Sequence, residues 1–270
     1  MIEKISIKEP EPVIGLASEI VYRQEPYWCG ASARALKLSF MGPRRYYPYD
    51  PEVPARPCIL FFCGGGFQKQ DRNVWIPELV EYAKRGYNVI TADYDTFAFT
   101  RFPQPLIEAK AALRFIKANA EHFHIDPDRI AVMGESAGGQ LASWVAATMD
   151  DPAYEDGAYP EQDSHVKACV CMYPVTDVNA FSKPDTIRVY TDNFPDTCKL
   201  VTGNEPPFLI FHGTDDNQVP HSQSVALHEK LRACNVPCFL YLVEGANHAG
   251  PEFSDPEIKE KILAFLANVL

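Results

Sequence analysis

Residues 129–149 read RIAVMGESAGGQLASWVAATM. The apolar run at 130–133 has the character of a buried strand, and the small residues from Ser136 onward favour a helix. A short turn with the pattern G-x-S-x-G, at 134–138, joins the two. Its glycines permit a sharp bend that lifts the serine above the edge of a sheet, at a helix N-terminus where backbone N–H groups favour negative charge. The stretch therefore predicts a nucleophile elbow with Ser136 at its apex.

The overall composition excludes several classes of protein. The chain has 270 residues, 46% of them hydrophobic, which suits one large α/β domain. A formal net charge of −11 argues against a nucleic-acid surface, because phosphate binding needs clustered Lys and Arg. The start, MIEKISIKEPEP, is polar, and no apolar run has the length of a membrane span. We therefore expect a soluble cytoplasmic protein without a nucleic-acid or membrane partner.

Eight cysteines without a secretion signal are expected to be reduced thiols that serve as small core residues. Cys169 and Cys171 alternate along a predicted strand and share one face of it. A zinc site at this pair remains open as an alternative, but the second half of a ligand pattern is missing. The sequence accordingly predicts neither a metal site nor an organic cofactor.

Strand-like and helix-like segments alternate almost throughout the chain. Predicted strands lie at 35–40, 58–67, 88–92, 130–133, 166–173, 208–211 and 239–243, and predicted helices at 77–85, 107–122, 136 onward, 222–233 and 256–269. This order predicts an α/β fold with a mostly parallel sheet, helices on both faces, and functional loops at the C-terminal ends of the strands. Residues 57–270 form the predicted catalytic domain. Residues 1–56 form an N-terminal extension with one strand, preceded by a tail that packs on the flank of the domain.

An activated serine requires partners further along the chain. A base must take the hydroxyl proton, and a carboxylate must orient that base. In folds with this elbow the order is Ser, then Asp or Glu, then His. Two loops that follow predicted strands supply candidates in that order, HGTDDNQVP at 212–220 and GANHAG at 245–250.

With these motifs in place, the chain resembles α/β-hydrolases of the carboxylesterase type, similar to the hormone-sensitive-lipase-like and the acetyl-esterase or acetylxylan-esterase-like groups. The resemblance covers about residues 57–270. It rests on PDRIAVMGESAGGQLA, the Gly-rich loop, HG-x-x-D-x-x-VP and the late His. It implies an α/β-hydrolase fold with at most a small cap and a serine esterase activity that needs no cofactor.

The resemblance also assigns the partners of Ser136. The acid of the family falls on Asp216 rather than on its neighbour Asp215, and the base falls on His248, which glycines bracket. Asp177 is the reserve acid. Histidines without an expected catalytic role are His212, His221 and His228.

The oxyanion that forms on attack needs preorganised donors. By the same matching, these are the backbone N–H groups of Gly65, Gly66 and Ala137. The family usually has His at the position of Cys63, the first residue of the Cys-Gly-Gly-Gly-Phe loop. Because a thiol is a weak hydrogen-bond donor, we expect this loop to be held differently or less firmly.

The sequence therefore predicts a serine carboxylic-ester hydrolase acting on a small-molecule ester. The loops at 150–164 and 176–207 lie at the predicted rim and are too polar to build a long apolar groove, so short acyl esters, such as those of acetylated sugars, are the expected substrates. Two alternatives stay open: a serine peptidase of the prolyl-oligopeptidase type, although 270 residues leave no room for its propeller or large cap, and a non-catalytic ligand-binding homologue. The oligomeric state is not predicted. Six aromatic residues are candidates either for pocket walls or for core: Phe67, Trp75, Tyr94, Phe97, Phe99 and Tyr173.

Overall fold

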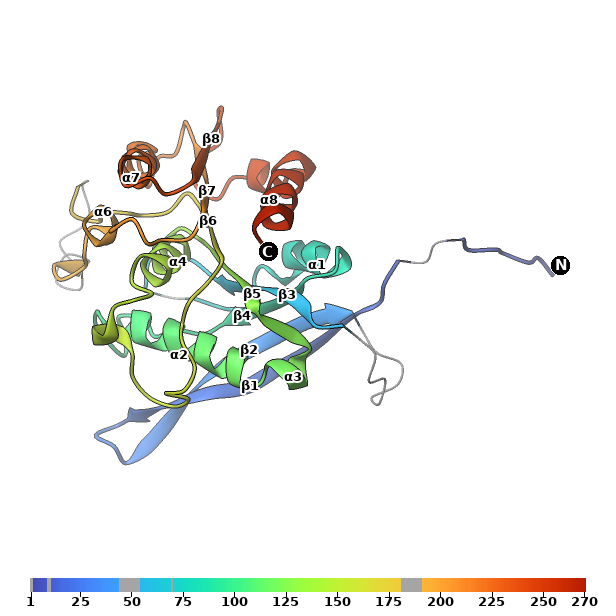
Figure 1. The fold of residues 1–270 in the computed structure, drawn as a ribbon, viewed down its shortest axis with the longest axis horizontal. Helices are drawn as coiled ribbons and strands as arrows, with labels where there is room; N and C mark the ends of the chain where they lie inside the picture. Colours follow the sequence, from blue (N-terminus) through green and yellow to red (C-terminus); the bar gives the residue numbers. More distant parts are fainter. Residues whose placement is uncertain (1, 9–10, 44–53, 69, 181–190) are drawn as a thin grey trace.

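The computed structural model describes residues 2–8, 11–43, 54–68, 70–180 and 191–270. Within these ranges, eight strands form one sheet in the order β1-β2-β4-β3-β5-β6-β7-β8 (Figure 1). The strands are β1 (Ile14–Tyr27), β2 (Ser32–Pro43), β3 (Arg56–Phe62), β4 (Asn88–Ala92), β5 (Ile125–Glu135), β6 (Ala168–Met172), β7 (Phe208–Gly213) and β8 (Cys238–Val243). The pairs β1–β2 and β2–β4 are antiparallel, and β3 to β8 are parallel to one another. The prediction of a mostly parallel sheet is confirmed.

Helices cover both faces of this sheet (Figure 1). Helices α1 (Ile76–Lys84) and α8 (Pro256–Val269) pack on one face, and α2 (Gln104–Ala118), α4 (Ala137–Ala147) and α7 (Ser222–Ala233) pack on the other. Shorter elements are α3 (Ala120–Phe123), α6 (Thr197–Leu200), η1 (Pro152–Tyr154) and η2 (Pro251–Ser254). Side chains alternate along a strand, so Leu60 of β3 joins the core under α2 and α4, whereas Ile59 joins the core under α1 and α8.

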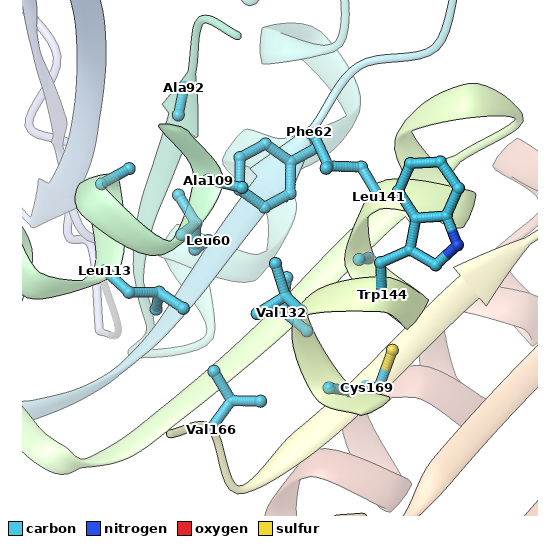
Figure 2. Packing of buried hydrophobic residues seen from close by; sticks show 14 of the residues in the cluster. Leu60, Phe62, Ala92, Ala109, Leu113, Val132, Leu141, Trp144, Val166 and Cys169 are labelled. Carbon is cyan, nitrogen blue, oxygen red and sulfur yellow. The ribbon is translucent and has the colours of Figure 1, made fainter. Parts of the chain in front are cut away.

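The larger core lies between the sheet and helices α2, α4 and α7. Figure 2 shows how Phe62 of β3 and Val132 of β5 face Leu113 of α2 and Leu141 and Trp144 of α4. All five side chains are completely buried. Burial of a side chain of this size contributes roughly 1.5–3 kcal/mol, so this packing fixes α4, and with it the elbow, against the sheet.

The N-terminal region differs from the expectation. Residues 14–27 of the tail before residue 35 form the long strand β1, which pairs with β2 and makes the sheet edge. Only Tyr22 of β1 is buried, so the strand lacks the apolar alternation that identifies a buried one. Its register shifts between Ala17 and Ile20 and again between Val21 and Arg23. Such irregularities are common on edge strands, where they hinder pairing with another chain.

Other boundaries differ by a few residues. Helix α2 begins at Gln104 rather than at 107, because Pro105 suits the first helical turn, and it ends at Ala118 before the separate short helix α3. Residues 181–190 of the predicted rim loop 176–207 lie outside the described residues, and the described remainder contains α6. No helix in the described ranges combines the length and apolar character that a bilayer span requires. All eight cysteines are free thiols.

Candidate active site

The predicted elbow is present between β5 and α4. β5 ends at Glu135, α4 begins at Ala137, and Ser136 between them has a φ of +53°. This left-handed conformation is strained for a residue with a side chain, and close packing sustains it. A Cβ on Gly134 would lie 2.2 Å from the carbonyl oxygen of Gly138. The elbow can therefore form only with glycine at that position.

His248 joins Ser136 to Asp216. Its Nε2 lies 2.9 Å from Ser136 Oγ, and its Nδ1 lies 2.6 Å from Asp216 Oδ2. Ser136 follows β5, Asp216 follows β7 and His248 follows β8. Because these strands are parallel, their C-terminal ends bring the three residues to one edge of the sheet. The side chain of Asn247 ties two of the loops together, since its Oδ1 accepts from the backbone N–H groups of Asn217 and His248 at 3.1 and 2.7 Å.

Asp216 is held as a carboxylate. Its other oxygen, Oδ1, accepts from the backbone N–H groups of Gln218 and Val219 at 2.9 and 2.8 Å. Burial by itself would raise the pKa of this carboxyl, but hydrogen bonds from His212 and His248, with those of the two backbone groups, hold the pKa well below its usual range. A carboxylate at Oδ2 requires that His248 donate through Nδ1–H. Nε2 is then free to accept the proton of Ser136.

His212 also contacts Asp216, which the sequence did not indicate. The buried ring of His212 places Nε2 2.9 Å from the carbonyl oxygen of Val219 and 3.3 Å from Asp216 Oδ2. Because both neighbours accept, Nε2 carries a proton, and Nδ1 lies 2.7 Å from the hydroxyl oxygen of Ser224. His212 is thus a donor that helps to fix the acid.

The two rival acids have other partners. Asp215 is exposed, and its Oδ1 accepts from the hydroxyl of its neighbour Thr214 at 3.0 Å. Asp177 Oδ1 accepts from the backbone N–H of Asn179 at 2.8 Å. Of the three candidate acids, Asp216 is the one that contacts His248 in the described part of the chain.

The glycine-rich loop after β3 contains two residues with positive φ. Gly65 and Gly66 have φ values of +122° and +62°, which only glycine adopts readily. The backbone N–H groups of Gly65, Gly66 and Ala137 have no acceptor among the described residues. Tyr94 anchors the loop, since its hydroxyl donates to the carbonyl oxygen of Cys63 at 2.6 Å.

Glu135 provides a second anchor for this loop, and the sequence did not single it out. Glu135 is buried and occupies the first x position of the G-x-S-x-G motif, directly before the elbow serine. Its Oε1 accepts from the backbone N–H of Gly64, from the indole N–H of Trp75 at 3.2 Å, and from the thiol of Cys63 at 3.8 Å. Burial raises the pKa of Glu135, whereas the hydrogen bond from Gly64 opposes the rise. Glu135, a residue of the elbow, therefore helps to fix the position of the loop that contains Cys63.

The aromatic candidates take different positions. Tyr173 packs edge-on against His248, with 4.8 Å between ring centroids, and is fully buried. Phe67, Tyr94 and Phe97 belong to the buried core. Phe99 is 52% exposed.

Comparison with known proteins identifies the family of the chain. The model of the BD-FAE family matches residues 46–231. The esterase LipC of Mycobacterium tuberculosis is 31% identical over 217 residues, which are 73% of this chain and 54% of LipC. The chain spans about half the length of the first curated relatives that it matches.

Two solved structures extend the likeness over nearly the whole chain. The Est2 esterase of Thermogutta terrifontis, in its propionate-bound form, has 25% identity and a TM-score of 0.75, and the match covers 96% of this chain and 95% of that one. The acetyl ester-xyloside bifunctional hydrolase of Caldicellulosiruptor lactoaceticus has 25% identity and a TM-score of 0.73, with 97% of both chains covered. The predicted α/β-hydrolase fold is confirmed.

Proposed function

The chain belongs to the BD-FAE family and has the α/β-hydrolase fold, and on that premise we propose that it is a serine carboxylic-ester hydrolase. The observation that carries the proposal is the continuous contact from Ser136 through His248 to Asp216. Relatives named as esterases support the reaction class. Among the described residues, no group of three His, Cys, Asp or Glu side chains could hold a metal ion.

In the proposed mechanism, Ser136 Oγ attacks the ester carbonyl carbon while His248 Nε2 takes the hydroxyl proton. The carbonyl oxygen becomes an oxyanion, which accepts hydrogen bonds from the backbone N–H groups of Gly65, Gly66 and Ala137. The tetrahedral intermediate then expels the alcohol, which receives the proton from His248. Water, deprotonated by the same ring, attacks the acyl-enzyme and releases the carboxylic acid and the free Ser136 hydroxyl.

Short acyl groups fit this site best. Phe67 follows Gly66 directly, and its ring packs against Trp144 and Phe194, with centroids 5.8 and 5.0 Å away. All three rings are buried, so their mutual packing fills the space beside the glycine-rich loop. The Thermogutta relative has propionate bound, which supports a preference for acyl groups of that size.

For the alcohol we propose a neutral polar group such as an acetylated sugar. The net charge of −11 disfavours an anionic substrate. The Caldicellulosiruptor relative is named as an acetyl ester-xyloside hydrolase, which supports the same class. We further propose residues 57–270 as the catalytic domain, residues 1–56 as its extension, and a cytoplasmic location.

The direct test combines turnover with covalent labelling. Wild-type protein should hydrolyse p-nitrophenyl acetate and react once with a fluorophosphonate probe, whereas Ser136→Ala should lose both reactions and keep its circular dichroism spectrum. Labelling of Ser136→Ala at the wild-type rate would reject Ser136 as the nucleophile. Wild-type protein that neither turns over nor is labelled would favour a non-catalytic ligand-binding homologue.

A further inference from the structure

The end of strand β6 contacts both the proposed nucleophile and the proposed base. The carbonyl oxygen of Met172, the last residue of β6, accepts the backbone N–H of Ser136 at 3.0 Å. The ring of the next residue, Tyr173, packs against that of His248, with 4.8 Å between the two centroids. Two consecutive residues therefore hold the two groups between which the proton of Ser136 would move.

Tyr173 does not line a substrate pocket, because its side chain is completely buried. The sequence left open whether this residue belongs to a pocket wall or to the core. Its backbone has a φ of +38°, which is strained for a residue with a side chain. Such conformations persist only where the surrounding structure enforces them, and they cluster at active sites. The strain therefore points to a role beside His248 that space-filling alone does not explain.

Tyr173 is itself held in place by neighbouring elements. Its backbone N–H donates to the carbonyl oxygen of Phe211 in β7 at 2.6 Å. Its ring also packs against that of Phe253 in η2, with 4.5 Å between the centroids, and Phe253 is buried as well. Because the interior is close-packed, a side chain fixed in this way restricts the orientation of a group that packs against it.

His248, by contrast, lies on a loop that is mostly exposed. Within residues 244–250 only Ala246 is buried, and Ala249, directly after His248, has a φ of +53°. The contact of Nδ1 with Asp216 fixes one atom of the imidazole. The last side-chain torsion of His is broad, so this single contact still allows the ring plane to pivot. A second ring packed against the imidazole restricts that pivot and keeps Nε2 directed at Ser136 Oγ.

The contact with His248 depends on the ring of Tyr173 rather than on its hydroxyl. The buried hydroxyl oxygen has no hydrogen-bond partner among the described residues. Burial, followed by the nearby charge of Glu135, raises the pKa of Tyr173, so the hydroxyl stays protonated and neutral. A phenylalanine ring at this position should therefore make the same contact with the imidazole.

We propose that Tyr173 is a positioning residue, whose ring holds the imidazole of His248 in the orientation that accepts the proton of Ser136. The inference rests on the proposed ester hydrolase function. Because the buried ring does not bind substrate, its loss should lower kcat and leave KM nearly unchanged. Misplacement of a catalytic group by about 1 Å can cost roughly 10²-fold in rate.

The test separates the ring of Tyr173 from its hydroxyl and from the core in general. Tyr173→Leu and Tyr173→Met both remove the planar ring and keep an apolar side chain, so either variant serves if the other does not fold. Each should lower kcat for p-nitrophenyl acetate roughly 10- to 100-fold, with KM changed less than about threefold. Tyr173→Phe, which keeps the ring, should stay within about threefold of wild type. Phe265→Leu is the matched control, because it removes a buried ring of the same core on α8, and its kcat should stay within about twofold.

A proton resonance reports the position of His248 without turnover. The Nδ1 proton that His248 donates to Asp216 across 2.6 Å should give a downfield signal in the ¹H NMR spectrum. The signal should be sharp in wild type, Tyr173→Phe and Phe265→Leu. In Tyr173→Leu and Tyr173→Met it should be broadened, because a loosened imidazole exchanges this proton with water.

The outcomes separate this proposal from the proposed function. A folded Tyr173→Leu with wild-type kcat and an unchanged signal would overturn the positioning role, and so would an equal loss in Tyr173→Phe or in Phe265→Leu. Failure of both ring-less variants to fold would assign Tyr173 to the core and overturn it as well. In each of these cases the esterase stands if wild-type protein hydrolyses p-nitrophenyl acetate. A wild-type protein that hydrolyses no ester, but whose signal depends on the Tyr173 ring, would refute the proposed function and keep the positioning role.

Discussion

The indole Nε1 of Trp75 lies 3.2 Å from Oε1 of Glu135, the same carboxylate oxygen that accepts the backbone N–H of Gly64. Glu135 immediately precedes the elbow serine, and Gly64 precedes Gly65 and Gly66, two of the three proposed oxyanion donors. One buried carboxylate therefore couples the elbow to the glycine-rich loop. Burial and the nearby Glu135 charge raise the pKa of Cys63 to about 12, so its thiol stays protonated as a weak additional donor.

This coupling predicts that Glu135 positions the oxyanion donors. Loss of a direct oxyanion donor costs about 10²–10³ in kcat, and a displaced loop should cost less. We expect Glu135→Ala to lower kcat for p-nitrophenyl acetate by roughly 10- to 100-fold with KM changed less than about threefold. Glu135→Gln, which keeps an acceptor for Gly64, should recover most of the loss. A Glu135→Ala enzyme with wild-type kcat would show that Gly64 does not need this anchor.

The choice of acid is testable with a matched pair of adjacent residues. Asp216→Asn should lower kcat by about 10³- to 10⁴-fold, because an amide no longer holds His248 in the required tautomer. Asp215→Asn should stay within about twofold of wild type, since Asp215 is exposed and contacts Thr214 instead. Both variants are compared by steady-state kinetics with p-nitrophenyl acetate. The reverse outcome would move the acid to Asp215.

Sequence patterns predicted the buried strands and the elbow because both obey local rules. The strand at 88–92 and the helices at 222–233 and 256–269 were predicted with their observed bounds. Strand β1 was missed because an edge strand with one buried side chain has no apolar period to detect. The pairing of β1 with β2 depends on the assembled sheet and not on the local sequence of β1.

Supporting residues escaped prediction for a different reason. Glu135 binds the backbone of Gly64, 71 positions earlier in the chain, and His212 contacts Asp216, four positions later. No local sequence pattern indicates that Glu135 and Gly64 come together. A hint was available for Glu135, because an ionisable residue at the buried end of a central strand needs polar partners. The resemblance supplied the positions of Asp216 and His248, whereas their mutual contact came from the structure.

A buried carboxyl on α2 predicts a pH dependence of stability. Glu108 is completely buried, its Oε2 accepts the backbone N–H of Asp95 at 2.6 Å, and burial followed by the nearby Asp95 charge raises its pKa. The folded protein therefore keeps a proton that the unfolded chain loses above the ordinary Glu pKa of about 4.3, so stability falls as pH rises from there toward the raised pKa.

Glu108→Gln should remove this contribution. We expect the free energy of unfolding of wild type, relative to that of Glu108→Gln, to fall between pH 5 and pH 8 with a slope of at most about 1.4 kcal/mol per pH unit. Urea unfolding at several pH values measures it. Glu121→Gln, at an exposed position on α3, is the control and should show no such slope. Parallel pH profiles for wild type and Glu108→Gln would mean that Glu108 is ionised in the folded protein.

The last prediction concerns the length of the acyl chain. Each buried methylene contributes about 0.8 kcal/mol when apolar walls cover it, and a chain that projects into solvent gains nothing. Phe67, Trp144 and Phe194 form an aromatic cluster next to the glycine-rich loop. The ring centroid of Phe194 lies 5.0 Å from that of Phe67 and 5.1 Å from that of Trp144. We expect kcat/KM for p-nitrophenyl esters to be highest from acetate to butyrate and to fall beyond.

Removal of one ring of that cluster should change the preferred length. Phe194→Ala opens space beside Phe67, so its optimum should move toward hexanoate or octanoate, while the cavity lowers the free energy of unfolding by about 3–5 kcal/mol. Phe239→Ala, with the same chemical change at an exposed site, should keep the wild-type optimum. The measurement is kcat/KM across the ester series, at a temperature where all three proteins are folded. A wild-type kcat/KM that rises from butyrate through octanoate to palmitate would contradict the short-acyl proposal. The aromatic cluster would then not limit the length of the acyl chain, and the enzyme would act as a lipase.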